Sequence, residues 1–254
     1  MVGIDRFISS YGASGLFYNL DKQTVADILA VSQECTATEN EYLLYEGDQI
    51  EYLFFVLQGE LITFRTNTQG DEVSVRLLES GDVCGDSIFF MDKVGSSIGI
   101  KALVGAKFLK IPRKIVLKLV SENIQFSNNI VNVLANFYQM ALMQIHNLAV
   151  KKTKDRLGHF LLFQHLKKRH SSRDVELYLT FKKNVIANFL GMTPETLSRQ
   201  LHALEMDKYI TIDKEEIYLS SPHSLCHFCD EDTAVFCKDL TGCPNKRSKN
   251  LELS

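Results

Sequence analysis

The distribution of glycine and proline changes abruptly near residue 112, and this change limits what the chain can fold into. Between Tyr42 and Ile111, short β-rich runs are separated by glycines, several of which are followed by aspartate. From Arg113 to Val150 neither glycine nor proline occurs, and the apolar pattern becomes helical. Short strands at such spacing favour a sandwich or small barrel, whereas the later stretch favours one long helix.

Composition places the chain among ordinary globular proteins. Its 254 residues are 45% hydrophobic and 23% charged, which suits two domains with an appendage and excludes a disordered or fibrous chain. No apolar run reaches the roughly 18–20 residues needed to cross a bilayer, and the N-terminus lacks the order of a signal peptide. We therefore expect a cytoplasmic protein with reduced thiols and no membrane partner.

Charge is unevenly distributed along the chain. Residues 1–147 contain 11 Lys and Arg against 17 Asp and Glu, a net charge of −6. Residues 148–221 contain 13 Lys and Arg against 9 Asp and Glu, a net charge of +4. A polyanion such as DNA would therefore bind the second part, although ordinary scatter of surface charge would also explain the difference.

The helical stretch carries more apolar residues than one buried face requires. A second apolar flank, formed by Val133, Met140 and Ile145, accompanies the main row. The main row advances in steps of four and three, as in the seam of a two-stranded coiled coil: Ile130, Leu134, Phe137, Ala141, Gln144 and Leu148. We predict that the flank packs on the β-rich domain and that the seam forms a homodimer. The alternative is a single amphipathic helix packed on its own domain.

The segment that follows predicts a helix–turn–helix and a β-hairpin. A short apolar helix ends at Gly191, Thr193 is a good N-cap, and Pro194 suits the first position of the next helix. The runs Tyr209–Ile212 and Glu216–Leu219 predict the two strands of a wing. The buried stripe of the second helix is formed by Leu197, Leu201 and Leu204.

Three polar residues share the outer face of this second helix. Glu195, Ser198 and Arg199 lie at i, i+3 and i+4. Arg can bind guanine as a fork, Glu can accept from cytosine, and Ser can bond to several bases, so these are candidates for reading a major groove. The candidates for phosphate contacts are Lys182, Lys183 and Thr193. The alternative is a Glu–Arg pair on a solvated helix.

These segments resemble the Crp/Fnr family of bacterial transcription regulators over about residues 19–221. The motifs that carry the resemblance are VIANFLGMTPETLSRQLHALE, YEGDQIEYLFFVLQGELITF and LLESGDVCGDSIFF. The resemblance implies an α+β fold with an N-terminal cyclic-nucleotide-binding-like β-roll (a jelly-roll barrel), a long dimerisation helix and a C-terminal winged helix-turn-helix. It also implies that Glu195, Ser198 and Arg199 read palindromic double-stranded DNA with TTGA-type half-sites, and that RNA polymerase is a partner.

The expected organisation follows from these assignments. Residues 1–112 form the sensory β-roll domain with an N-terminal helix, 113–150 the dimerisation helix, 151–221 the DNA-binding domain and 222–254 a cysteine-rich tail. The sequence contains no Gly-rich phosphate loop, and the acidic residues of the β-rich part are scattered at turns. We therefore predict that the protein is not an enzyme.

The cassette that binds the cyclic phosphate in cAMP-responsive family members is degenerate here. The aligned residues are Gly85, Asp86, Ser87, Ser96 and Ser97. Ser96 replaces the arginine that pairs with the phosphate, and this loss of a charged donor argues against cAMP binding. The cations that would have to substitute are Arg76, Lys93 and Lys101.

Haem is another ligand found in the family. All seven histidines lie at or beyond His146, so the β-rich part offers no imidazole. The remaining axial candidates are His146, Cys35, Cys84 and Met91. We favour the structural role for each of them, a core position for the thiols and a helix-surface position for the histidine, over haem ligation.

Four cysteines follow the wing in the pattern C-x2-C-x7-C-x5-C: Cys226, Cys229, Cys237 and Cys243. A C-x2-C pair brings two thiolates onto one metal, and two further cysteines complete four-coordination. Some Fnr relatives, notably the Bacillus type, carry a C-terminal cluster that holds a [4Fe–4S] centre, so the resemblance favours an iron–sulfur cluster. A structural zinc site, in which His227 could replace a cysteine, a thiol–disulfide switch and an unliganded tail remain alternatives.

The leading hypothesis is a homodimeric, sequence-specific transcription regulator that responds to a redox or gas signal, oxygen or nitric oxide, through the tail. One alternative is the same type of regulator with a small ligand or haem in the β-roll and zinc in the tail. Another is a ligand-binding barrel that acts mainly on a protein partner, although the intact recognition helix argues against it.

Overall fold

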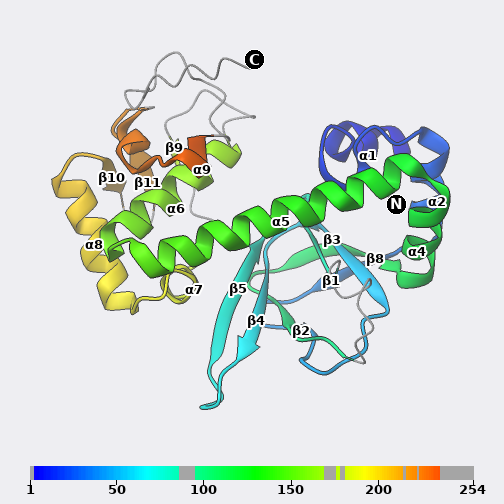
Figure 1. Ribbon diagram of the computed structural model, residues 1–254, viewed down its shortest axis with the longest axis horizontal. Coiled ribbons are helices and arrows are strands. Elements are labelled where there is room, and N and C mark those ends of the chain that lie inside the picture. The colour runs from blue at the N-terminus through cyan, green and yellow to red at the C-terminus, as the bar shows by residue number, and fades with distance from the viewer. Residues whose placement is uncertain are drawn as a thin grey trace, which may run out of the picture. The chain divides into compact units, whose positions relative to one another are not determined.

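The computed structural model of the chain describes residues 3–85, 95–168, 176–177, 181–213, 216–221 and 223–234. Two compact units form, Met1–Ala141 and Leu142–Ser254, and their boundary lies within helix α5 (Ile124–Val150) (Figure 1). Helices and strands occur in both units, which confirms the predicted α+β class. Within the described residues, no helix combines the length and apolar character needed to span a membrane.

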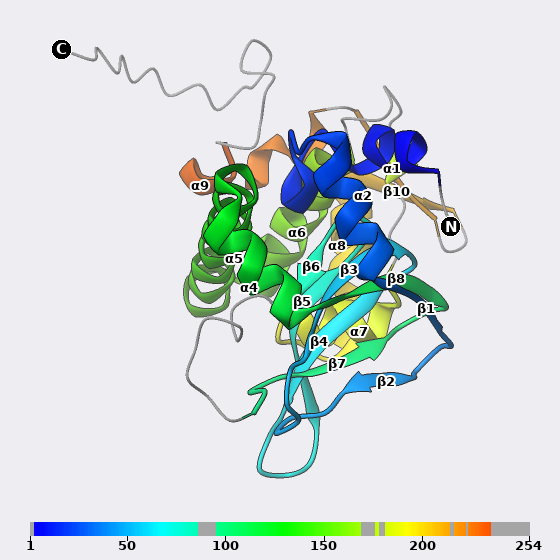
Figure 2. The same ribbon diagram turned by 90° about the vertical axis from the view of Figure 1, so that its right-hand side faces the viewer.

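The described part of the first unit contains a β-roll of two antiparallel four-stranded sheets (Figure 2). One sheet has the order β1 (Gln33–Ala37), β8 (Ala106–Pro112), β3 (Tyr52–Gln58) and β6 (Val83–Cys84). The other has the order β2 (Tyr42–Leu44), β7 (Gly99–Ala102), β4 (Leu61–Thr66) and β5 (Glu72–Leu78). Side chains of both sheets, including Leu53, Leu61 and Ile100, are fully buried in one core, which confirms the predicted roll.

Helical segments before the strands complete this core. They are α1 (Ile4–Tyr11), the short 3-10 helix η1 (Gly15–Phe17) and α2 (Lys22–Val31). The ring centroid of Phe17 lies 4.8 Å from that of Phe7 and 4.9 Å from that of Phe55 on β3, both edge-to-face. This geometry is favourable for aromatic pairs and joins the N-terminal helices to the roll.

The stretch predicted as one helix over residues 113–150 forms two, α4 (Arg113–Glu122) and α5. Asn123 lies between them in an extended conformation (φ −122°, ψ 104°). Its Oδ1 accepts a hydrogen bond of 2.9 Å from the backbone N–H of Phe126. Asparagine is a strong N-cap, so its side chain starts a new helix at this point. The prediction of an uninterrupted helix was therefore wrong.

The second unit contains the predicted winged helix-turn-helix. Its helices are α6 (Thr153–Lys168), α7 (Lys183–Phe189) and α8 (Pro194–Met206). Its sheet has the order β10 (Ile210–Asp213), β11 (Glu216–Leu219) and β9 (Glu176–Leu177). The predicted stripe of α8 is confirmed, because Leu197, Leu201 and Leu204 are at most 3% exposed. Helix α8 packs against α6, which carries the buried Leu157 and Leu161.

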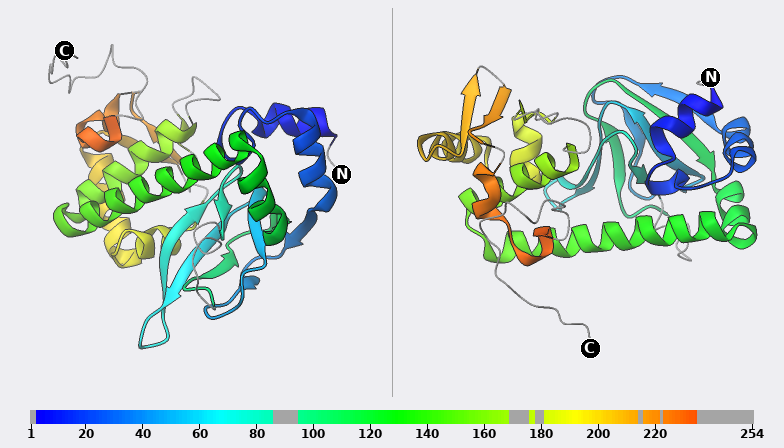
Figure 3. Two further views of the ribbon diagram at one scale, coloured as in Figure 1. Left: turned by 45° about the vertical axis from the view of Figure 1, so that its right-hand side comes forward. Right: turned by 90° about the horizontal axis from the view of Figure 1, so that it is seen from above.

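After the wing, the chain folds back onto α6. This return segment consists of a 3-10 turn, η2 (Ser224–Phe228), and a short helix, α9 (Glu231–Ala234), drawn in orange in Figure 3. Phe228 is 7% exposed and lies against Gly158 of α6. A Cβ atom added to Gly158 would lie 2.5 Å from the Phe228 ring, so glycine is what allows this close approach.

Replacing Gly158 by alanine should therefore destabilise the second unit. Alanine favours a helix by about 1 kcal/mol over glycine, but overpacking a filled contact costs about 1–3 kcal/mol, and we expect a net loss. Urea unfolding followed by circular dichroism measures the change. In the double variant Gly158→Ala, Phe228→Ala the ring that clashes is absent, so alanine at position 158 should now stabilise the helix. The double variant should therefore be more stable than the single variant Phe228→Ala. An additive loss would contradict the contact.

Candidate DNA-reading helix and cysteine turn

The start of α8 is fixed by the cap that the sequence predicted. Thr193 Oγ1 accepts a hydrogen bond of 3.2 Å from the backbone N–H of Thr196. Pro194 occupies the first turn of the helix, where the missing N–H of proline leaves no partner unsatisfied. The cap therefore defines which residues of the first two turns face outward.

Glu195, Ser198 and Arg199 all lie on the exposed surface of α8, as predicted. The Ser198 hydroxyl donates to the carbonyl oxygen of Pro194 over 3.0 Å, which leaves its oxygen lone pairs available as acceptors. Arg199 Nη2 donates to Thr196 Oγ1 over 3.0 Å, so its guanidinium is oriented along the helix. The three side chains can therefore be presented together to one groove.

On this face the carboxylate of Glu195, a hydrogen-bond acceptor, lies near the guanidinium of Arg199, a donor. The pKa of Glu195 lies below its usual value. The causes are a hydrogen bond from the backbone N–H of Glu195 itself, a hydrogen bond from Thr193 and the nearby charge of Arg199. Glu195 is thus an ionised acceptor throughout the neutral range. Lys182, at the N-cap position of α7, and Lys183, in its first turn, are also exposed, as phosphate contacts would require.

Two of the four tail cysteines lie on the described return segment. Cys226 is in η2 and 7% exposed, and Cys229, which follows η2, is half-buried. The Cys229 backbone N–H donates to the Cys226 carbonyl over 3.1 Å, so the pair spans one 3-10 turn. Residues three apart in such a turn lie on the same side, which fits the first two ligands of a metal or cluster. Cys237 and Cys243 lie outside the described residues.

The imidazole beside this turn is not the one that the sequence suggested. The ring of His227 stacks on Tyr209 at 5.9 Å between centroids. Nδ1 of His223 lies 3.8 Å from Cys226 Sγ instead. Among the described residues, no group of three or more His, Cys, Asp or Glu side chains is placed to hold a metal ion. The donor set in the described turn is therefore two thiols with a histidine alongside.

A buried polar network, which the sequence did not reveal, adjoins Cys229. Asp230 accepts hydrogen bonds from Lys151 and Thr233 and lies 3.3 Å from Nε2 of His159. Burial raises the pKa of Asp230, but the hydrogen bonds from His159, Lys151 and Thr233 outweigh it and bring the pKa far below the usual value. His159 and Lys151 lie 71 and 79 residues before Asp230 in the sequence, so local patterns could not identify them as its partners.

One residue of the degenerate cassette, Ser96, forms local hydrogen bonds with Ile98. Ser96 is 4% exposed, and its hydroxyl donates to the Ile98 carbonyl over 2.6 Å. Ser97 is exposed, Gly85 is buried, and Asp86 and Ser87 lie outside the described residues. Of the candidate substitute cations, Arg76 stacks on Phe137 at 4.6 Å from the ring centroid, Lys101 pairs with Glu72, and Lys93 lies outside the described residues.

The residues considered for haem occupy different environments. Cys84 is 1% exposed in the core of the roll, and Cys35 on β1 is half-buried. His146 is exposed on α5, and Met91 lies outside the described residues. Cys84 therefore has the burial of a core residue, Cys35 packs against that core, and His146 has the exposure of a helix-surface residue.

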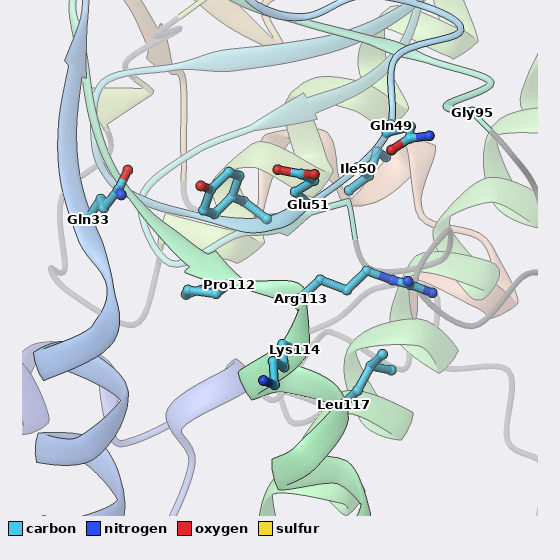
Figure 4. Close-up of a pocket in the computed structure, with 10 residues that line it drawn as sticks. Gln33, Gln49, Ile50, Glu51, Gly95, Pro112, Arg113, Lys114 and Leu117 are labelled. Atoms are coloured by element: carbon cyan, nitrogen blue, oxygen red, sulfur yellow. The ribbon is translucent and has the colours of Figure 1, made fainter.

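A surface pocket of about 780 Å³ lies at the start of α4 (Figure 4). Arg113 and Lys114 enter it from the first turn of α4, and Gln49 and Glu51 from the loop before β3. The Arg113 backbone N–H donates to the Glu51 carbonyl over 2.7 Å. The lining thus mixes both signs of charge, and its cations come from α4 rather than from the cassette.

The predicted dimer seam is corrected by the burial pattern of α5. Ile130 is 3% exposed in the core of the first unit, and Leu134 packs against the same core. Phe137 is half-buried beneath Arg76, and Ala141 is also half-buried. Only Leu148 of the predicted seam is substantially exposed, at 43%.

The exposed apolar row of α5 lies on a neighbouring face. Ile124, Val131, Tyr138 and Ile145 recur every seven residues and are 60–77% exposed. Exposed residues between them complete the steps of four and three: Asn128, Ala135, Leu142 and Ala149. Because a seam must be accessible to a partner, this row fits a coiled-coil contact and the predicted row does not. We call the eight residues the outer row.

A β-roll followed by a long helix and a winged helix-turn-helix defines a class of DNA-binding regulators. The family described as "Cyclic nucleotide-binding domain" matches residues 34–123, and the family described as "Crp-like helix-turn-helix domain" matches residues 155–228. Together the two matches span more than half of the chain. The chain belongs to the Crp/Fnr family of transcription regulators, whose members bind DNA as dimers and are not enzymes.

Individual relatives agree with this assignment. The chain is 25% identical over 191 residues to the "Cyclic AMP receptor protein" of Thermus thermophilus, covering 75% of this chain and 85% of that protein. It is 28% identical over 184 residues to the "Fumarate and nitrate reduction regulatory protein" of Vibrio cholerae, covering 68% and 72%. The fold is similar to that of FixK2 from Bradyrhizobium japonicum, with a TM-score of 0.70 at 20% identity, covering 79% of this chain and 98% of that chain.

If the outer row forms the dimer contact, a charge placed in it should separate the protomers. We expect Val131→Glu to raise the dimer dissociation constant at least about 100-fold, because two unpaired carboxylates would be desolvated at the contact. Sedimentation equilibrium measures the constant, and circular dichroism verifies folding. Asn136→Glu places the same charge on an exposed position of α5 outside the row and should leave the dimer intact. Equal effects of the two variants would contradict the assignment.

Proposed function

We propose that this chain is a homodimeric regulator that reads a palindromic operator with TTGA-type half-sites through Glu195, Ser198 and Arg199. The observation that carries the proposal is that these three side chains share the exposed face of a capped α8 in a Crp-like helix-turn-helix. The net positive charge of residues 148–221, together with Lys182 and Lys183, supports contacts with the phosphates.

Each reading residue has a distinct role in the proposal. Arg199 bonds a guanine through two parallel N–H donors, and Glu195 accepts from a cytosine amino group. The Thr196 hydroxyl holds the guanidinium of Arg199 before DNA arrives, which lowers the ordering cost of binding. Operator binding would place the protein in the cytoplasm, with RNA polymerase as its functional partner.

The proposed input is a redox or gas signal, oxygen or nitric oxide, received at Cys226, Cys229, Cys237 and Cys243. The first two thiols lie on one 3-10 turn, an arrangement that suits a shared metal centre. A [4Fe–4S] cluster, when bound, would supply a centre that oxygen or nitric oxide can destroy or modify. The chain's own contribution is to hold the turn that carries Cys226 and Cys229 on α6, where Phe228 packs against Gly158.

A second candidate keeps the operator and changes the input. His223 lies beside Cys226, and imidazole with thiolates is a common donor set for structural zinc. A small ligand or haem in the β-roll would then provide the signal. The local hydrogen bonds of Ser96 and the engagement of Arg76 and Lys101 speak against cAMP as that ligand, because no free charged donor is offered by these residues.

Replacing Arg199 by alanine should lower affinity for the palindrome and relax the preference for its contacted base pair by about 1–3 kcal/mol, or roughly 5–150-fold. Fluorescence anisotropy with the palindrome and with duplexes changed at single positions measures this difference. Lys183→Ala is the matched control, since it should weaken binding to all sequences alike and reduce the salt dependence. An unchanged preference in Arg199→Ala would count against the proposed reading face.

Protein purified without oxygen should contain iron and sulfide and show a broad absorption band at about 400 nm that air bleaches. Cys226→Ser should abolish both, because it removes one of the proposed ligands. Cys84→Ser is the control, since Cys84 lies in the core of the β-roll. Colourless protein containing zinc would support the second candidate, and a sharp Soret band would indicate haem.

A further inference from the structure

The cysteine segment is anchored to the second unit by side chains that follow Cys229 directly. Thr233 of α9 is fully buried, and Asp230 precedes that helix. The Thr233 backbone N–H and hydroxyl both bond to Asp230 Oδ1, over 2.9 Å and 2.6 Å. Both bonds close the turn with partners from within the segment itself. We call Asp230 and Thr233 the anchor. The match to the Crp-like helix-turn-helix family ends at residue 228, so the anchor lies beyond it.

The anchor continues into a directional chain of hydrogen bonds. Thr233 has one hydroxyl proton, which it donates to Asp230, so it must accept from His159 Nε2, 2.6 Å away. The same N–H also reaches Asp230 Oδ2, which lies 3.3 Å from Nε2. The other ring nitrogen, Nδ1, then accepts from the Asn147 side-chain amide, 3.1 Å away. Every member of the chain from Asn147 to Asp230 fits one set of proton positions, and such chains strengthen cooperatively in a buried setting.

This chain connects three parts of the second unit. Asn147 belongs to α5, His159 to α6, and Thr233 to α9. Lys151, in the turn between α5 and α6, pairs with Asp230 from a further direction. Helix α6 also receives Phe228 on one side and packs against α8, which carries the proposed reading residues. One helix therefore contacts both the cysteine turn and the DNA-reading helix.

We infer that Asp230 and Thr233 are positioning residues that couple the cysteine turn to operator binding through His159 of α6. The inference deepens the proposed function and rests on it. When the turn is docked, the hydrogen-bond chain holds α6, and through it α8, in the arrangement that binds the operator. When a change at Cys226 or Cys229 lifts the turn, the chain is broken and α8 loses this support. By linkage, operator binding must favour the docked turn to the same extent.

The test uses full-length, reduced protein, so that it does not depend on any bound cluster. The rates at which N-ethylmaleimide modifies Cys226 and Cys229 are measured by peptide mass spectrometry, with and without saturating TTGA-type palindromic duplex. Buried thiols react slowly, so the rates report how often the turn is undocked. Operator should slow modification of the wild type about 5-fold or more, as expected for typical coupling between sites.

Two substitutions at one position isolate the hydroxyl. Thr233→Val keeps the shape of the side chain but breaks the hydrogen-bond chain, so modification should be faster and independent of operator. Thr233→Ser keeps the hydroxyl and should retain the slowing seen in the wild type. Circular dichroism and sedimentation verify that both variants are folded dimers. A merely structural role would lower stability in Thr233→Val and leave the effect of operator on the rates intact.

The outcomes separate the two proposals. If the wild type binds the operator but its modification rates do not change, the coupling is overturned and the proposed function stands. Retained coupling in Thr233→Val overturns the inference in the same way. If neither this protein nor protein purified without oxygen binds the palindrome, the proposed function fails and the coupling fails with it.

Discussion

Helix α5 has to bury apolar side chains on two faces, and much of the structure depends on how it does so. Phe126, Ile130 and Val133 point into the core of the β-roll. The outer row, represented by Val131 and Tyr138, is left exposed in the single protomer. A continuous exposed apolar stripe of this kind is costly in water, since each buried apolar Å² contributes roughly 25 cal/mol. Members of the Crp/Fnr family act as dimers, so a second copy of the chain is the partner that we expect to cover this face.

Helix α6 plays the corresponding part in the second unit. Its low amphipathicity reflects contacts on several sides, with apolar Leu157 and Leu161 buried together with the polar His159. A buried imidazole is costly without partners, but here both ring nitrogens are hydrogen-bonded. Gly158, the next residue back, has no side chain and admits Phe228. Helix α6 therefore lacks a uniform apolar face, and His159 and Gly158 form specific contacts with the return segment instead.

Sequence patterns predicted what local chemistry determines. The cap at Thr193, the buried stripe of α8 and the exposure of Glu195, Ser198 and Arg199 depend on spacing within a few residues, and the structure confirms these placements. The seam of α5 was misassigned because Ile130 and Val131 are both apolar neighbours, and only the contact with the distant β-roll shows which one is buried. The His159–Thr233 contact joins residues 74 apart, so no local pattern could indicate it.

The two candidate signal sites, a ligand site in the β-roll and the cysteine turn, differ in how each could affect α8, the candidate DNA-reading helix. A ligand in the β-roll lies in the first unit, whereas α8 belongs to the second unit, and α5 is the helix within which the two units meet along the chain. Such a ligand would also have to displace Ser96 from Ile98 or Arg76 from Phe137 to gain a donor from those residues. The cysteine turn instead belongs to the same unit as α8 and shares the contact helix α6 with it. Under the coupling that we infer, a structural change at Cys226 or Cys229 would reach α8 within one packed unit, because close-packed interiors transmit local strain.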